Sequence, residues 1–227
     1  MDIIKDLHKK IVVSSQAMPN EPFYDENCMI AMMKSVVNGG AGALRVAGAR
    51  DVKNAKSLFK IPVIGLTKPQ ELPPNWRSVV YITPTLKEVQ ELIDANADII
   101  AFDGTSRSRG EGCSLKDIID KIHSAKKLAM ADISTLEEGI NCEKLGADIV
   151  STTLAGYTEE SGEATEMPDF ELLEDLVKNV SIPVILEGRI WSPEDVKKGF
   201  ELGAYCVVIG SAITRPQLIT KRFVQRG

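Results

Sequence analysis

The chain has 227 residues, of which 44% are hydrophobic and 26% charged, an ordinary balance for a globular protein with a substantial core. A net charge of −5 gives no general attraction to nucleic acid or anionic membrane, and no apolar run reaches the length of a membrane span. The four cysteines and two histidines show no metal-ligand spacing, so we expect reduced thiols, no metal and a cytoplasmic location.

Short apolar runs alternate with longer segments of helical period, a pattern typical of βα units around a parallel sheet. The expected strands are Ile11–Ser14, Ala43–Val46, Pro62–Leu66, Val79–Ile82, Asp98–Phe102, Leu128–Ala131, Asp148–Thr152, Pro183–Leu186 and Tyr205–Ile209. The expected helices are Glu26–Asn38, Val52–Phe59, Leu86–Ala95, Leu115–Lys126, Thr135–Leu145, Phe170–Asn179 and Pro193–Leu202. An open, doubly wound sheet is the main alternative, but no GxGxxG motif opens the first unit.

Two long connections interrupt this alternation. Val79–Ile82 follows the preceding strand across a proline-rich stretch and without a helix, so we interpret it as a short extra strand in a long loop. Eight strands then remain, and we expect residues 1–227 to form one (β/α)8 TIM barrel, a single domain of the α/β class. The second connection, Leu154–Met167, is the best candidate for a mobile lid, because long loops in compact domains tend to be functional.

The active site of such a barrel lies where the strands end. Polar or charged side chains occur at all eight expected strand ends, and Lys68, Asp132 and Glu187 each come at the end of an apolar run. The alternative explanation is that strand ends are polar because they meet solvent. Three charged residues in equivalent places favour a site over that explanation.

The ends of the last two strands predict a phosphate-binding cup. Gly188-Arg189 and Gly210-Ser211 allow the backbone to approach a ligand closely, and N–H groups at the start of a short helix hold anions. Arg215 follows within one helical turn and could add a charge-assisted contact. Each half of this pattern is common, but both halves at these two strands indicate a phosphate site.

Lys68 is the most suggestive single residue, because a lysine that ends an apolar strand is partly desolvated and has a lowered pKa. Its neutral amine could act as a general base or form a Schiff base. Arg45 on the neighbouring strand favours the neutral form, whereas Asp132 or Glu187 would favour the charged one. A purely structural ion pair with one of these acids is the alternative.

Several longer stretches resemble one known family along nearly the whole chain. They include Val13-Ser-Ser-Gln-Ala, Pro62-Val-Ile-Gly-Leu-Thr-Lys, Ser151-Thr-Thr-Leu-Ala-Gly-Tyr-Thr, Ile185-Leu-Glu-Gly-Arg and Val208-Ile-Gly-Ser-Ala-Ile-Thr-Arg-Pro. The sequence is similar to the N-acetylmannosamine-6-phosphate 2-epimerases of bacterial sialic acid catabolism. The Thr-Thr-Leu-X-Gly-Tyr-Thr and Ala-Ile-Thr-Arg-Pro stretches are specific, whereas the Glu-Gly and Gly-Ser pieces occur in many phosphate-binding barrels.

The resemblance implies an isomerase that interconverts N-acetylmannosamine 6-phosphate and N-acetylglucosamine 6-phosphate without a metal or a cofactor. It implies catalytic roles for Lys68 and Glu187. It also implies substrate contacts and a phosphate site, which fall on Gln16, Arg45, Asp132 and Arg215 and on Gly188, Arg189, Gly210 and Ser211, respectively. The only expected partners are the amino-sugar phosphate and a second copy in a possible homodimer.

Two other functions remain possible from the residues alone. The first is another phosphate-binding barrel enzyme, such as a ribulose-phosphate-type epimerase, an indole-glycerol-phosphate synthase or a thiamine-phosphate synthase. The ribulose-phosphate type usually has metal-binding histidines, and the thiamine type needs a magnesium-pyrophosphate site; neither is visible in this sequence. The second is a non-catalytic sugar-phosphate sensor, because the fold alone does not decide function.

Overall fold

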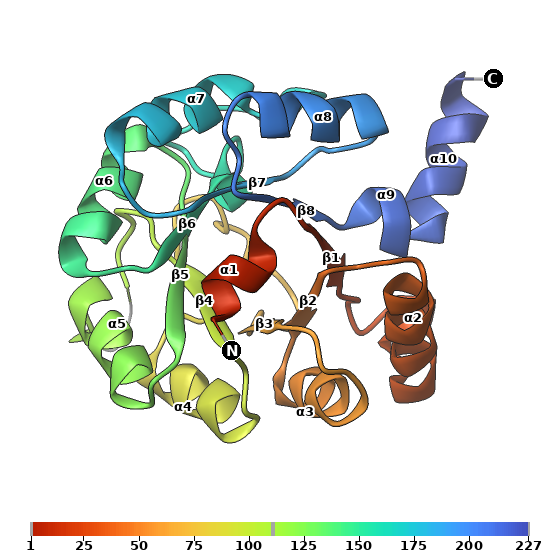
Figure 1. Cartoon of the computed structure of the whole chain (residues 1–227), viewed down its shortest axis with the longest axis horizontal. Helices are drawn as coiled ribbons and strands as arrows, with labels where there is room; N and C mark the ends of the chain where they lie inside the picture. The colour runs from red at the N-terminus through yellow and green to blue at the C-terminus, as the bar shows by residue number, and fades with distance from the viewer. Residues whose placement is uncertain (1, 110–111, 227) are drawn as a thin grey trace.

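The computed structural model describes residues 2–109 and 112–226 and shows a closed barrel of eight parallel strands in sequential order (Figure 1). The hydrogen bonds between the first strand and the last close the ring, with Val12 paired to Val208. The strands are β1 Ile11–Ser15, β2 Ala43–Ala47, β3 Val63–Leu66, β4 Ile99–Asp103, β5 Leu128–Asp132, β6 Ile149–Ser151, β7 Val184–Glu187 and β8 Cys206–Ile209. The predicted (β/α)8 barrel is therefore confirmed.

The helices form an outer ring around the strands (Figure 1). Seven follow β1 to β7 in turn, and two follow β8. They are α2 Glu26–Asn38, α3 Ala49–Leu58, α4 Leu86–Asp94, α5 Leu115–Ser124, α6 Leu136–Leu145, α7 Phe170–Asn179, α8 Pro193–Glu201, α9 Ser211–Thr214 and α10 Pro216–Arg226; α1 Ile3–Leu7 precedes β1, and short 3-10 turns are η1 Pro22–Tyr24 and η3 Thr152–Leu154. The expected α2 and α7 match residue for residue, and the other expected helices match within three residues at each end.

Alternation along the strands separates two layers of packing, because successive side chains point to opposite faces. One face packs against the helices, with Leu44, Ala131 and Leu186 among its buried residues. The other face fills the barrel interior, with Ala43, Met130 and Ile185 among its members. Arg45, Asp132 and Glu187 each lie two residues after one of these interior residues, so the strand period turns all three toward the barrel axis.

The short extra strand expected at Val79–Ile82 does not form, and these residues follow a loop. This loop instead fills the gap where β3 and β4 diverge beyond two paired positions. The backbone N–H of Thr83 donates to the Thr67 carbonyl at 3.1 Å, and the Ile82 carbonyl accepts from the Asp103 N–H at 2.9 Å. Because its backbone groups bond to residues at the ends of two different strands, the segment cannot pair along either strand as an additional strand.

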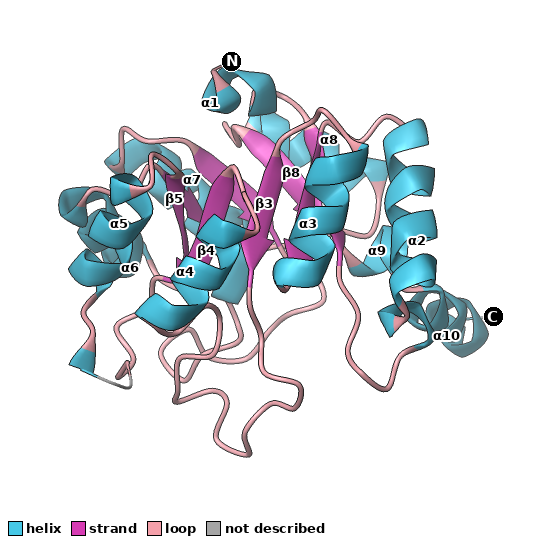
Figure 2. Ribbon diagram, turned by 90° about the horizontal axis from the view of Figure 1, so that it is seen from below, coloured by secondary structure: helices cyan, strands magenta, loops and turns pink. Residues whose placement is uncertain are grey.

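The two ends of the barrel differ. Figure 2 shows α1 across one end, where Leu7 enters the interior core, and long loops at the opposite end, where the strands finish. At the chain's C-terminal side, α10 extends away from the barrel and exposes 75% of Phe223 and 76% of Val224. No helix in the described part of the chain is long and apolar enough to cross a membrane.

Candidate active site

One large cavity of about 1110 Å³ opens among the loops that follow the strands. This volume is at the upper end of the range for small-molecule pockets. Most of the residues singled out from the sequence line it: Gln16, Lys68, Glu187, Gly188, Arg189, Gly210, Ser211 and Arg215. Arg45 and Asp132 do not line it and lie below its floor, each with 0% of its surface exposed. The predicted residues therefore come together at two depths of one site.

Lys68 lies at the cavity wall, two residues beyond the last residue of β3. The Lys68 side chain is exposed at the cavity wall, yet desolvation by the surrounding protein lowers its pKa to about 8, and the guanidinium of Arg45 acts in the same direction. The carboxylates of Glu187 and Asp132 oppose this shift but do not cancel it. The surroundings of Lys68 therefore favour the neutral amine more than water does, at a position that faces the cavity.

Arg45 and Asp132 form a buried pair across the barrel interior. Nη1 of Arg45 donates to Oδ1 of Asp132 at 3.0 Å, and Nη2 donates to Oδ2 at 2.6 Å, a two-pronged contact that fixes both planes. Burial alone would lower the pKa of Arg45, but the two carboxylates of Asp132 and Glu187 outweigh it and raise that pKa. Arg45 therefore stays charged beneath the floor of the cavity.

Glu187 joins this pair from the end of β7. Its Oε2 lies 3.2 Å from Nη1 of Arg45 and 3.1 Å from the hydroxyl of Thr153. Burial raises the pKa of Glu187 above its ordinary value, with Asp132 adding to the rise while Arg45 and Lys68 oppose it. Glu187 thus holds a proton more readily than a solvent-exposed glutamate, next to an amine that loses one readily.

The ends of β7 and β8 present backbone N–H groups to the cavity. Gly188 has φ 108°, a left-handed conformation that favours glycine, and Arg189 has φ 57°. Within the described part of the chain, the N–H groups of Gly188, Arg189, Gly210 and Ser211 donate no hydrogen bond. Open N–H groups in such a concavity bind anions. This group of four amides is called the amide cup below.

Arg215 lies beside the amide cup but already has a partner. Its Nη2 donates to Oε2 of Glu21 at 2.6 Å, and Gln217 donates to Oε1 of the same carboxylate at 2.8 Å. Glu21 comes from the loop after β1, so this ion pair connects the first and last βα units. An anion in the cup would find the Arg215 guanidinium held in place rather than free to rotate.

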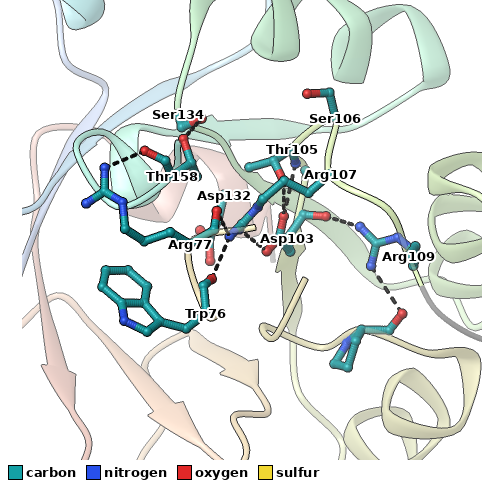
Figure 3. Close-up of polar contacts among 12 residues, drawn as sticks. Trp76, Arg77, Asp103, Thr105, Ser106, Arg107, Arg109, Asp132, Ser134 and Thr158 are labelled. Carbon is teal, nitrogen blue, oxygen red and sulfur yellow. Dashed lines mark hydrogen bonds and ion pairs between the residues drawn. The ribbon is translucent and has the colours of Figure 1, made fainter. Parts of the chain in front are cut away.

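A network of arginines joins the loops that follow β3, β4 and β6 (Figure 3). Arg107 donates to Oδ2 of buried Asp103 at 2.6 Å, and its Nη1 donates to the carbonyls of Trp76 at 3.0 Å and Arg77 at 3.2 Å. Arg77 in turn donates to the Thr158 carbonyl at 2.7 Å. Asp103, the polar end of β4, is therefore an anchor for the loops that roof the cavity.

Arg189 fastens the Leu154–Met167 segment from its other side. Its Nε donates to the Met167 carbonyl at 2.7 Å, and its Nη1 donates to the Ala155 carbonyl at 2.6 Å. The guanidinium also lies 5.6 Å from the centre of the Tyr157 ring. The segment expected to be a mobile lid is thus attached to both flanking loops, and the side chain of Arg189 serves the loop while its backbone serves the amide cup.

Sequence reasoning missed several residues that line the cavity, above all Thr153, Trp76 and Tyr157. Thr153 directly follows the expected strand Asp148–Thr152, but nothing in its surroundings along the sequence predicts a role for it. Trp76 lies in the proline-rich loop, where no periodic pattern places a side chain. Among the described residues, no group of three or more His, Cys, Asp and Glu side chains is arranged to hold a metal ion.

Together, these features define the class of (β/α)8-barrel proteins that place an anion cup at β7 and β8 beside a lysine and a glutamate. Residues 29–226 match a family model described as "Putative N-acetylmannosamine-6-phosphate epimerase". The chain belongs to this N-acetylmannosamine-6-phosphate epimerase family.

Individual relatives agree with this assignment. The chain is 50% identical over 224 residues to a "Putative N-acetylmannosamine-6-phosphate 2-epimerase" of Clostridium perfringens, covering 98% of this chain and 97% of that one. It is 48% identical over 226 residues to a protein of the same name from Caldanaerobacter subterraneus, covering 99% and 93%.

Solved structures show the same relationship. A structure of the N-acetylmannosamine-6-phosphate 2-epimerase from Clostridium perfringens aligns with a TM-score of 0.94 and 48% identity, covering 100% of this chain and 97% of that chain. The thiamine phosphate pyrophosphorylase from Pyrococcus furiosus aligns with a TM-score of 0.59 at 14% identity, which shows a shared fold alone.

Proposed function

We propose that this protein is an epimerase that interconverts N-acetylmannosamine 6-phosphate and N-acetylglucosamine 6-phosphate, as its family membership indicates. The observation that carries this proposal is the pairing of Lys68, whose pKa is lowered to about 8, with Glu187, whose pKa is raised, around one cavity. Groups whose environments move their pKa values toward neutrality are suited to transfer protons at ordinary pH.

The chemistry of the reaction explains why two such groups are needed. C2 of the sugar becomes acidic only when it lies next to a carbonyl, so the ring must open to expose the aldehyde at C1. Neutral Lys68 takes the proton from C2, and the electron pair of the broken C–H bond passes into an enolate. The newly formed Lys68 ammonium lies beside that negative charge and stabilises it. Glu187 then donates a proton to the opposite face of C2, which gives the other epimer.

The amide cup supplies the orientation. A 6-phosphate held by the N–H groups of Gly188, Arg189, Gly210 and Ser211 fixes the far end of an extended, flexible substrate. Binding energy from this remote group holds C2 between Lys68 and Glu187. Gln16, which lines the same cavity, is placed to contact the sugar, whereas contact by Arg45 and Asp132 stays a prediction because both lie below the floor.

The decisive experiment is to run the reaction in D2O and follow both epimers by NMR. The proposal expects product with deuterium at C2, because solvent exchanges with the protons on the amine and the carboxyl group. Binding of the sugar phosphate with neither epimerisation nor C2 exchange would support the alternative of a non-catalytic sensor. Lys68→Ala is expected to lose more than nine-tenths of kcat/KM, a cost above about 1.4 kcal/mol in transition-state stabilisation.

We further propose that the chain forms one folding unit, acts in the cytoplasm and pairs as a homodimer. The pairing of β1 with β8 supports one unit, because neither of these strands can leave without opening the barrel. Cys28, Cys142 and Cys206 are free thiols, as expected in a reducing compartment. Exposed Phe223 and Val224 on α10 offer an apolar contact, and light scattering of the purified protein tests the dimer.

A further inference from the structure

Thr153 occupies a position that the proposed mechanism does not yet use. Its hydroxyl lies 2.8 Å from Oδ1 of Asp132, 3.1 Å from Oε2 of Glu187 and 2.9 Å from Oγ of Ser151. It also lines the cavity, whereas Asp132 and Arg45 do not. Thr153 therefore connects the cavity-lining carboxyl group to the buried ion pair beneath it.

The two oxygens of Glu187 have different surroundings. Oε2 accepts a hydrogen bond from the hydroxyl of Thr153 and forms an ion pair with Nη1 of Arg45, which lies 3.2 Å away. Oε1 forms no hydrogen bond with any described residue. We propose that Thr153 is a positioning residue that, with Arg45, holds Oε2 as the oxygen that bears the charge, so that the proton Glu187 delivers to C2 is carried on Oε1. This inference rests on the proposed function and assigns a role within the same site.

Arg45 cannot provide this control alone. Both its Nη atoms donate to the carboxylate of Asp132, at 3.0 and 2.6 Å, and both of these distances are shorter than the 3.2 Å from Nη1 to Oε2 of Glu187. The threonine hydroxyl rotates freely about one bond and carries one proton, for which carboxylate oxygens are stronger acceptors than a serine hydroxyl. When Glu187 is charged, Thr153 donates to Oε2. When Glu187 is protonated, the same hydroxyl turns to Oδ1 of Asp132, so the site gains or loses a proton without leaving an unsatisfied donor.

The proton balance of the step follows from this arrangement. Lys68 removes the C2 proton and becomes an ammonium, while the electron pair of the C–H bond enters the enolate. The bond between Oε1 and its proton then breaks, the proton forms a new bond to C2 on the opposite face, and Glu187 becomes a carboxylate. Thr153 stabilises that new charge at Oε2 without giving up its own proton.

A partition experiment tests the role of Thr153 directly. In D2O, the enolate either takes deuterium back from Lys68, which labels the recovered starting epimer, or takes it from Glu187, which gives labelled product. Thr153→Val keeps the shape of the side chain but removes the hydroxyl. We expect kcat to fall about 10-fold or more with KM little changed, less than the roughly 100- to 10,000-fold that an acid–base group itself contributes, because Thr153 acts through Glu187. We also expect the ratio of labelled starting epimer to labelled product to rise.

The controls separate this role from a structural one. Thr153→Ser restores a hydroxyl and is expected to recover most of kcat and the original labelling ratio. Thr165→Val removes an exposed hydroxyl from the same connection, where it donates only to the Met167 carbonyl, and is expected to change neither quantity. The urea midpoint of each variant shows whether it is folded. An unchanged labelling ratio in folded Thr153→Val overturns the inference, and a folded Thr153→Ser that behaves like the valine variant does the same. An inactive wild-type protein instead refutes the proposed function.

Discussion

The pH dependence of kcat/KM is the sharpest consequence of the two unusual proton-transfer groups. The productive form has a neutral Lys68 and a protonated Glu187. Since the pKa of Lys68 is about 8 and that of Glu187 is raised, activity is level between the two values and declines on either side. Below the pKa of Glu187, the fraction of neutral Lys68 continues to fall as the pH falls, whereas the fraction of protonated Glu187 is already close to its maximum. Above pH of about 8, Lys68 is already neutral, and each further unit of pH removes protonated Glu187.

The magnitude follows from the lowered pKa of the amine. With a pKa of about 8, roughly a tenth of the molecules hold a neutral Lys68 at pH 7, whereas an ordinary pKa of 10.5 leaves roughly 1 in 3,000. The environment of the cavity therefore increases the reactive form about 300-fold. An amine used alone as the only base gives a different curve, which rises to pH of about 8 and then stays level.

The assay is kcat/KM measured from pH 6.5 to 10, because this ratio reports the groups of the free enzyme. The alkaline limb is the diagnostic one, since the substrate phosphate itself titrates near pH of about 6 and complicates the acid limb. A level profile above pH 8 would refute Glu187 as the proton donor, and a turning point near 10.5 would refute the desolvated amine. Lys127→Ala is the matched control, because this partly buried lysine precedes β5 at the opposite end of the barrel.

Three further outcomes are expected. Asp132→Asn leaves the buried Arg45 charge poorly compensated and should cost about 3–5 kcal/mol of unfolding free energy, measured in urea. As a control, Asp2→Asn changes an exposed ion pair and should leave the urea midpoint unchanged. Equal urea midpoints for the two variants would contradict the buried-pair argument. Arg77→Ala should speed proteolysis within the Leu154–Met167 connection with little change in the urea midpoint, and an unaltered cleavage rate would show that its carbonyl contacts hold nothing. Gly188→Ala forces a side chain into φ 108° and should raise KM for the phosphorylated substrate more than it lowers kcat; a loss confined to kcat would place the phosphate elsewhere.

The fold and most of the cavity lining could be predicted from the sequence because both follow from periodicity. Apolar runs of strand length place their last residues at one end of a barrel, which brings Lys68 and Glu187 to one cavity without any knowledge of their contacts. The strand at Val79–Ile82 was wrong because its apolar letters resemble a strand, while the backbone partners it finds belong to β3 and β4. No local pattern reveals that Ile82 and Thr83 fill a gap between strands far from them in the chain.

Depth within the barrel was the other quantity that periodicity could not supply. Arg45, Asp132 and Glu187 all point inward, but their register relative to one another decides which of them meet the substrate. Arg45 is the middle residue of β2, whereas Glu187 is the last residue of β7. The arginine therefore starts one layer lower than the glutamate. The long Arg45 side chain extends from there to the carboxyl group of Glu187, although Arg45 itself does not line the cavity.

This difference in depth explains why a buried ion pair is useful beneath a proton-transfer site. Moving charges out of water is costly, and a pair such as Arg45 and Asp132 is stable only with close, two-pronged contacts. These contacts hold Nη1 fixed, because a change of the Arg45 rotamer would leave both buried charges without a partner. The ion-pair partner of Glu187 is thus a group that does not move when the glutamate changes charge. The adjustable partner is then the hydroxyl of Thr153, which needs only a turn about one bond to follow each proton. A rigid charge below and a rotating hydroxyl beside it allow the carboxyl group to change protonation without moving its oxygens away from C2.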